Sequence, residues 1–198
     1  MSAALKLDLI AVEDYLAGEL ISPIKHEYLG GVVYAMAGAR NLHNDVAGNT
    51  FATLHLLLRG KRCKPYNSDT KIRIRLASQV RFYYPEVLVT CRPNPPTDSY
   101  QDEPVVIVEV LSKGTRRIDE GEKKDAYLTI LSLSAYILID QEAAAVVVHR
   151  RTIQGFVREV YEGLSAVIPL PEIDVELPLA EIYSGVQFCP DADESDLA

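Results

Sequence analysis

The sequence PVVIVEVLSKGTRRIDEGEKKDAY, residues 104–127, contains the pattern on which the expected fold of this chain depends. Its first part, residues 105–111, is an apolar run rich in β-branched side chains and interrupted only by Glu109. A run in which both the odd- and the even-numbered positions are apolar is typical of a strand covered on both faces in the middle of a sheet. Glu109 is therefore expected to lie where water is scarce, so its carboxylate must be paired or bound to a cation.

A helix is expected directly after this strand, because the period of the apolar residues becomes helical. Asp119, Lys123 and Tyr127 follow one another at intervals of four residues and should share one helix face. Two interpretations stay open. The buried acid and the helical lysine could form a metal site with an adjacent cation, or Asp119 and Lys123 could form a solvated ion pair worth about 0.3–0.5 kcal/mol. The pattern also predicts a capping box and an apolar stripe, formed by Asp119 with Glu122 and by Ile118, Ala126, Tyr127, Ile130 and Leu131.

A second isolated carboxylate, Glu86, lies in FYYPEVLVT, residues 82–90, which is predicted to form another buried strand. Pro85, directly before Glu86, cannot donate a normal ladder hydrogen bond at its own position. Two acids on neighbouring buried strands favour a cation between them, since like charges repel strongly away from water. Residues 135–140, AYILID, are expected to form a strand parallel to the central one, reached through the helical crossover.

The remaining segments predict short elements around this core. In residues 70–76, Lys71, Arg73 and Arg75 alternate and are expected to face outward, either as a solvated face or as a track for a phosphate backbone. We further expect helices at 9–18 and 41–60, hairpins at 25–37 and 143–163, strands at 62–67, 70–76 and 165–168, a proline-rich loop at 91–103 and a last helical turn within 177–185.

The composition is that of one globular domain, residues 1–188, followed by an acidic tail at 189–198. The net charge of −8 argues against a protein that coats nucleic acid, although basic residues can still cluster locally in an enzyme. No apolar run approaches the roughly 20 residues of a membrane span, and the first 16 residues lack the features of a secretion signal. Three widely spaced cysteines, Cys63, Cys91 and Cys189, favour a reducing cytoplasm over a disulfide framework.

Several motifs together resemble the Uma-type restriction endonuclease family of the PD-(D/E)XK nuclease superfamily. They are YYPEVLV, VVIVEVLS, KGTRRIDEGEKKDAY and YILID, with HEYLGGVVYAMAG, His43 and SDTKIRI upstream. The resemblance covers roughly residues 10–185. It implies an α/β restriction endonuclease-like fold, in which helices flank a mixed β-sheet that carries acids on two adjacent strands.

By this resemblance, Glu86 takes the position of the first metal-binding acid and Glu109 that of the second. Together with the backbone carbonyl of Val110 they would hold Mg²⁺ or Mn²⁺. The family pattern has aspartate at the first position, and the glutamate of this chain extends its carboxylate by one further methylene.

The superfamily's lysine normally lies two residues after the second acid, where this chain has Leu111. The resemblance implies that Lys123, from the following helix, takes its place, with Asp119 and Tyr127 as flanking family residues. We expect Lys123 rather than Lys124 to face the strand, since successive helical residues are about 100° apart, and we expect Lys124 to pair with Glu120. Glu27 and His43 are expected at the rim of the site.

The function expected from these features is a metal-dependent endonuclease that hydrolyses DNA, in the cytoplasm and as a possible homodimer because cutting two strands needs two sites. One alternative is a catalytically impaired relative that binds nucleic acid or a protein. Another is a structural α/β domain in which the buried acids pair with arginines.

Overall fold

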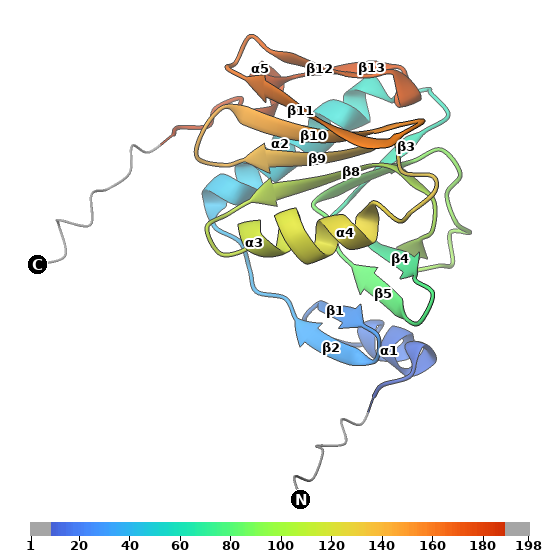
Figure 1. Ribbon diagram of the computed structural model, residues 1–198. Helices are drawn as coiled ribbons and strands as arrows, with labels where there is room; N and C mark the ends of the chain where they lie inside the picture. The colour runs from blue at the N-terminus through green and yellow to red at the C-terminus, as the bar shows by residue number, and fades with distance from the viewer. Residues whose placement is uncertain (1–8, 189–198) are drawn as a thin grey trace, which may run out of the picture.

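The computed structural model describes residues 9–188, which form a mixed α+β structure with β-sheets flanked by helices (Figure 1). The strands are β1 (His26–Leu29), β2 (Val32–Ala35), β3 (Lys64–Asn67), β4 (Lys71–Arg75), β5 (Val80–Tyr83), β6 (Val87–Thr90), β7 (Tyr100–Gln101), β8 (Pro104–Leu111), β9 (Ala135–Asp140), β10 (Ala145–Thr152), β11 (Gly155–Glu162), β12 (Val167–Leu170) and β13 (Val175–Pro178). The helices are α1 (Val12–Glu19), α2 (Asn41–Leu57), α3 (Arg116–Ile118), the π-helical turn η1 (Asp119–Lys123), α4 (Lys124–Tyr127), the 3₁₀ turn η2 (Pro171–Ile173) and α5 (Leu179–Ile182).

The larger sheet has the strand order β11-β10-β9-β8-β6-β3 and contains β8 in its interior, as predicted. The β8–β9 pair is parallel and the other pairs are antiparallel, so the helical crossover between β8 and β9 is also confirmed. Figure 1 shows α2 on one side of this sheet and the α3–α4 segment on the other.

The two faces of β8, which are formed by alternate residues, pack against different helices. Val106, Val108 and Val110 belong to the hydrophobic cluster that includes residues of α2. Ile107 and Leu111 belong to the cluster that includes residues of α4. Glu109 shares the parity of Ile107 and Leu111, so its side chain lies on the face that the α3–α4 segment covers.

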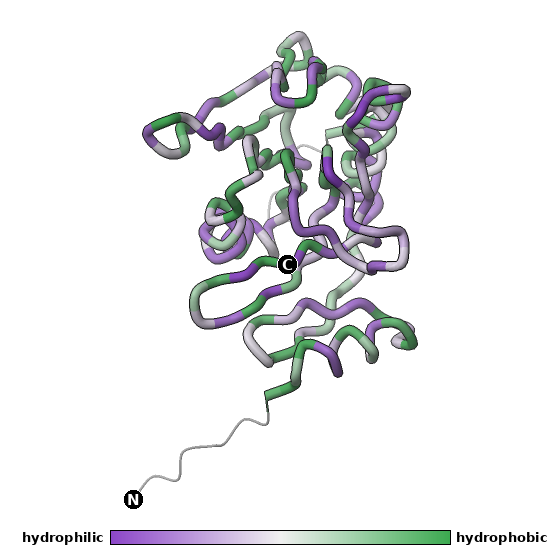
Figure 2. The backbone as a smooth tube through the Cα atoms, turned by 90° about the vertical axis from the view of Figure 1, so that its right-hand side faces the viewer, coloured by the Kyte–Doolittle hydropathy of each residue, from purple (hydrophilic) through white to green (hydrophobic). Residues whose placement is uncertain are grey.

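A smaller sheet with the order β2-β1-β5-β4-β7 lies toward the N-terminal end of the described chain. Figure 1 places α1 and the β1–β2 hairpin together there, and in Figure 2 the tube alternates between purple and green along this end, as amphipathic elements do. The buried faces of these elements meet through Tyr15, Tyr28 and Phe82.

The strand predicted at residues 82–90 is instead two strands, β5 and β6, which belong to different sheets. The chain leaves the small sheet after Tyr83 and enters the large sheet at Val87. Pro85 explains the break, because it lacks a backbone N–H and also restricts the backbone of Tyr84. Glu86 therefore lies at the junction of the two sheets rather than within a strand.

The predicted capping box and apolar stripe after β8 are partly wrong. The helix begins at Arg116, and Asp119 opens the π-helical turn instead of capping the helix. Ile118 is 48% exposed and Leu131 is 91% exposed, so neither belongs to the buried stripe. A π-turn changes the phase of the helix, and Leu131 lies beyond the end of α4, so a regular 3.6-residue period cannot describe this segment.

Two further expectations are corrected. Cys63 and Cys91 form a disulfide, because extending the β3–β6 register by one residue places them opposite each other. Lys71 is buried rather than turned outward, and Arg73 is bonded to Asp102.

Strands β7 and β13 were not predicted. No helix within residues 9–188 is long and apolar enough to cross a bilayer. Cys189, the tail at 189–198 and the first eight residues lie outside the described part.

Candidate active site

The two predicted acids lie next to each other: Glu109 is in β8, and Glu86 directly precedes β6, the neighbouring strand. In the antiparallel β6–β8 pair, Val87 is opposite Val108 and Leu88 is opposite Ile107. Extending this register by one residue places Glu86 opposite Glu109. Directly opposed like charges are destabilising, especially where one of them is buried, so both carboxylates need compensation from cations or hydrogen-bond donors.

Each carboxylate has one oxygen held by a neighbouring side chain. The Tyr127 hydroxyl donates to Glu109 Oε1 over 3.0 Å, and His43 Nε2 lies 2.8 Å from Glu86 Oε1, in position to donate. Among residues 9–188, no hydrogen bond is made to the Oε2 atom of either acid. Because both acids line the same cavity, each offers one oxygen to a ligand there.

Lys123 supplies the cation of the site. Its Nζ atom lies 3.0 Å from Glu27 Oε1, 3.5 Å from Glu109 Oε1 and 3.6 Å from Asp119 Oδ1. The Lys123 side chain is 12% exposed, so this is a buried network rather than the solvated helical ion pair considered above. Lys123 also lies over the ring of Tyr83, with 5.7 Å between Nζ and the ring centroid.

The π-helical turn spans Asp119–Lys123, and both of its end residues line the cavity. A π-turn inserts a residue into the helical repeat and is frequently found at functional sites. It also disturbs the regular backbone hydrogen bonds, and the Tyr136 hydroxyl donates to the Asp119 carbonyl oxygen over 3.0 Å. Glu120 pairs with Arg116 and not, as predicted, with Lys124.

Burial and the concentration of acids shift the ionisation of the site. Burial, only partly offset by the positive charge of Lys123, raises the pKa of Glu109 from 4.5 to about 8. The pKa of Asp119 is raised for the same reasons. For Lys123, burial disfavours the charged form, but the charges of Glu109, Glu27 and Asp119 outweigh it and raise the pKa. Lys123 is therefore an ammonium ion at neutral pH.

The acids and Lys123 open onto a cavity of about 790 Å³. The cavity also has a polar side chain with an unsatisfied atom, Gln141, which is 7% exposed and whose Oε1 has no hydrogen bond. The rim is formed by residues 34–40, at the end of β2 and directly after it, and by residues 112–115 after β8.

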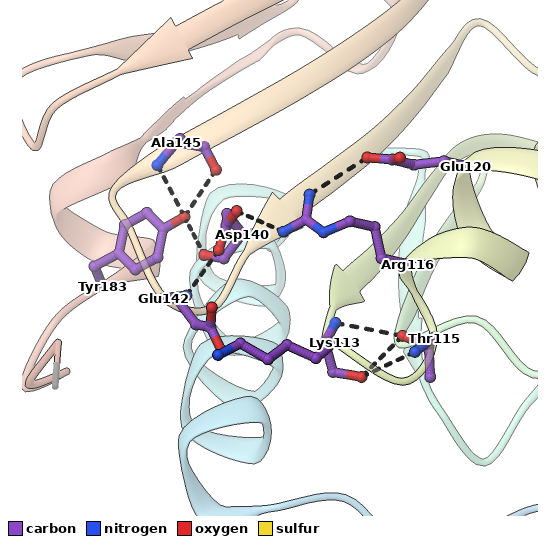
Figure 3. A network of polar contacts seen from close by, with 9 residues as sticks. Lys113, Thr115, Arg116, Glu120, Asp140, Glu142, Ala145 and Tyr183 are labelled. Carbon is purple, nitrogen blue, oxygen red and sulfur yellow. Dashed lines mark hydrogen bonds and ion pairs between the residues drawn. The ribbon is translucent and has the colours of Figure 1, made fainter. Parts of the chain in front are cut away.

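A polar network fixes the part of this rim that follows β8 (Figure 3). Arg116 Nη2 donates to Asp140 Oδ2 over 2.7 Å and joins the start of α3 to the end of β9. Tyr183 donates to the Asp140 carbonyl oxygen over 2.7 Å, and the backbone N–H of Glu142 donates to Asp140 Oδ1 over 2.8 Å. This network holds the segment containing Gln141 against the segment that leads to Lys123.

The structure brings together all the side chains proposed from the sequence, which are Glu27, His43, Glu86, Glu109, Asp119, Lys123 and Tyr127. Glu27 and His43 lie deeper than the rim position expected for them, since His43 is 6% exposed and Glu27 touches Lys123. Sequence reasoning missed Tyr83 and Gln141. Tyr83 is the last residue of β5, and Gln141 directly follows the buried strand AYILID, so position at the end of a strand was the available signal.

The sequence model of the Uma2 family, described as "putative restriction endonuclease", matches residues 12–180 of this chain. The chain belongs to the Uma2 family. This match covers all the side chains of the site described above.

Two similar proteins come from Synechocystis sp. (strain ATCC 27184 / PCC 6803 / Kazusa). The uncharacterised protein slr1290 is 28% identical over 180 residues, which cover 90% of this chain and 94% of the relative. The uncharacterised protein sll1609 is 31% identical over 136 residues, which cover 67% of this chain and 76% of the relative.

A solved structure with a similar fold is that of a putative nuclease belonging to DUF820 from Anabaena variabilis ATCC 29413. The TM-score is 0.68 at 15% identity, over 90% of this chain and 99% of the other. At this level of identity the similarity concerns the fold, which is the mixed α+β nuclease-type fold expected from the sequence.

Proposed function

We propose that this protein is a metal-dependent endonuclease that hydrolyses phosphodiester bonds of DNA with Glu86, Glu109 and Lys123. The observation that carries the proposal is the arrangement of two opposed carboxylates beside a buried ammonium ion in one cavity. Each carboxylate has one oxygen without a partner, so the arrangement can accept a cation without breaking the hydrogen bonds that hold it.

The residues present fit a hard divalent cation. Mg²⁺ is commonly held by one or two carboxylates, with water and substrate phosphate completing its shell. The Oε2 atoms of Glu86 and Glu109 and the backbone carbonyl of Val110 would provide the protein ligands. No group of three or more His, Cys, Asp or Glu side chains among residues 9–188 is arranged to hold a metal. A bound Mg²⁺ or Mn²⁺ would stabilise charge on the scissile phosphate and acidify a water molecule.

The protein's own side chains then have distinct tasks. Tyr127 and His43 orient the two carboxylates through the hydrogen bonds to their Oε1 atoms. Lys123 stays protonated because of its acidic neighbours, so it acts as a positive charge near the developing negative charge and not as a proton acceptor. Glu27 and Asp119 hold Lys123 in place and are positioning residues.

We also propose that two copies act together. Each chain carries one such site, and cleavage of both DNA strands requires two.

A second function is supported by one observation. Lys123 already pairs with Glu27, Glu109 and Asp119, so the acids are partly neutralised without any metal. A relative that has lost catalysis and binds nucleic acid or a protein could keep this network for stability alone.

A cleavage assay with supercoiled DNA separates the two. Under the proposal, nicked and linear DNA appear with Mg²⁺ or Mn²⁺ and are absent with a chelator. If neither ion supports cleavage but the protein still binds a DNA duplex, the non-catalytic alternative is supported.

A further inference from the structure

Lys71 is a buried lysine outside the candidate active site. It is 4% exposed, although its strand alternates with isoleucine and was expected to turn all its basic residues outward. Its neighbours of the same parity are different: Arg73 makes two hydrogen bonds of 2.7 Å to Asp102, and Arg75 is largely exposed. The Lys71 side chain makes no hydrogen bond or ion pair with any residue in the described part of the chain.

A second cavity, of about 550 Å³, is lined by Lys71. We call it the Lys71 cavity. Its walls are formed by the loop between α1 and β1, the turn between β3 and β4, and residues 98–101. Tyr84 lines both this cavity and the candidate active site, so the two cavities adjoin at one residue.

The acids around this cavity are engaged by other groups. Glu19 accepts a hydrogen bond from the Tyr84 hydroxyl over 2.7 Å and lies 2.7 Å from His26 Nδ1. Asp69 pairs with Lys25 at 2.6 Å, and Asp98 Oδ2 accepts a hydrogen bond from Asn94 Nδ2 over 3.1 Å. These contacts leave Lys71 without a carboxylate of its own.

The only specific contact of the Lys71 ammonium within residues 9–188 is with the ring of Tyr84, whose centroid lies 5.2 Å from Nζ. Burial lowers the pKa of Lys71 and is only partly opposed by the charge of Glu19. A buried ammonium without an anionic partner is costly, and a bound anion would remove that cost.

The cavity offers further donors for such an anion. Gln101 is 5% exposed, and its Oε1 accepts a hydrogen bond from the Asn94 backbone N–H over 2.8 Å, so its Nε2 group remains as a donor. Thr70 and Ser99, whose hydroxyl groups make no hydrogen bond among the described residues, also line the cavity. The Lys71 ammonium group with several neutral donors suits a phosphate group, which accepts hydrogen bonds through three or four oxygens.

We propose that the Lys71 cavity binds a phosphate group, with Lys71 as its cation, and that this phosphate belongs to the DNA strand next to the scissile bond. The second half of the proposal rests on the proposed nuclease function. It is supported by the wall that the two cavities share, and by the combination of aromatic rings with cations, which is typical of surfaces that follow single strands.

The test uses the full chain carrying Glu109→Gln, which should prevent cleavage but leaves the Lys71 cavity unchanged. Binding of inorganic phosphate and of a short single-stranded oligonucleotide is measured by calorimetry in the presence of a chelator. Lys71→Met keeps most of the side-chain volume and removes the charge, and Lys64→Met, at an exposed position on β3, is the matched control.

We expect Lys71→Met to weaken both phosphate and oligonucleotide binding at least tenfold and Lys64→Met to change the phosphate affinity less than twofold. If inorganic phosphate does not bind, or binds equally well to the Lys71→Met variant, the phosphate site is refuted. If phosphate binding is lost but oligonucleotide binding is unchanged, the site takes free phosphate and its assignment to the DNA strand is wrong. None of these results requires cleavage, so they are independent of the nuclease assay.

Discussion

Replacing Glu109 by glutamine should stabilise the metal-free protein, and the gain should grow with pH. The glutamate is 3% exposed and opposed by Glu86, and burial raises its pKa from 4.5 to about 8. Folded protein therefore retains a proton on Glu109 that the unfolded chain releases. Below pH 4.5 both states are protonated, so glutamate and glutamine should be nearly equivalent there.

The free energy of unfolding of the wild-type protein should fall as the pH rises from 4.5 to about 8, because the unfolded state loses its proton first. A shift of 3.5 pKa units (8 − 4.5) at about 1.36 kcal/mol per unit corresponds to a loss of about 5 kcal/mol. This is an upper limit for the gain from glutamine, because Lys123 loses one of its three carboxylate partners in the variant.

Chemical denaturation in chelator, at about pH 5, 6.5 and 8.5, would measure this difference. Glu176→Gln, at an exposed position on β13, is the matched control and should show no pH-dependent gain. A Glu109→Gln variant that is destabilised at the highest pH would refute the reasoning. It would mean that Glu109 is ionised and that its attraction to Lys123 exceeds the cost of burial.

Three other changes test further parts of the account. Lys123→Met should lower the rate of metal-dependent DNA cleavage by at least about 100-fold with little effect on metal affinity, whereas Lys124→Met should have little effect on the rate; the opposite order in single-turnover assays would contradict the assigned helix face. Glu86→Asp should retain cleavage or increase it, because it restores the side chain of the family pattern, and a loss of cleavage by a folded variant would show that the site is adapted to glutamate. Reduction of the Cys63–Cys91 disulfide, which closes a span of 28 residues, should lower the free energy of unfolding by about 3 to 4 kcal/mol; an unchanged denaturation midpoint with dithiothreitol would contradict this.

The central part of the fold could be predicted because its residues leave few alternatives. A strand whose odd- and even-numbered positions are both apolar must be covered on both faces. In the structure, β8 has α2 on one side and the α3–α4 segment on the other. The parallel pairing of β8 with β9 follows from the helical segment between them. The two acids stand out in the sequence for the same reason, since each interrupts an apolar segment.

The parts that were not predicted depend on contacts between distant segments. The break at Pro85 separates two sheets, and only the pairing of β5 with β1 and β4 shows that β5 has left the sheet of β6. The π-turn at Asp119 has no signature in the residue pattern, yet it changes which side chains face inward. His43 and Glu86 are 43 positions apart, and their 2.8 Å contact depends on how α2 packs on the sheet.

The pairing of cysteines and the burial of Lys71 show the limits of local patterns more clearly. Spacing alone gave no reason to join Cys63 to Cys91, because their contact follows from the register of β3 against β6. Alternation along β4 predicted an outward Lys71, but the loop between α1 and β1 covers that face of the strand.

Cleavage of supercoiled DNA by the wild-type protein and by Glu109→Gln, with Glu176→Gln as the control, tests whether Glu86 and Glu109 form a metal-dependent site. We expect the wild-type protein and the control to convert supercoiled DNA to nicked and linear DNA with Mg²⁺ or Mn²⁺. Addition of a chelator should stop this cleavage. Glu109→Gln should remain folded and give no product. Cleavage by Glu109→Gln at the wild-type rate, or cleavage by the wild-type protein that persists in chelator, would contradict a metal-dependent site at Glu86 and Glu109.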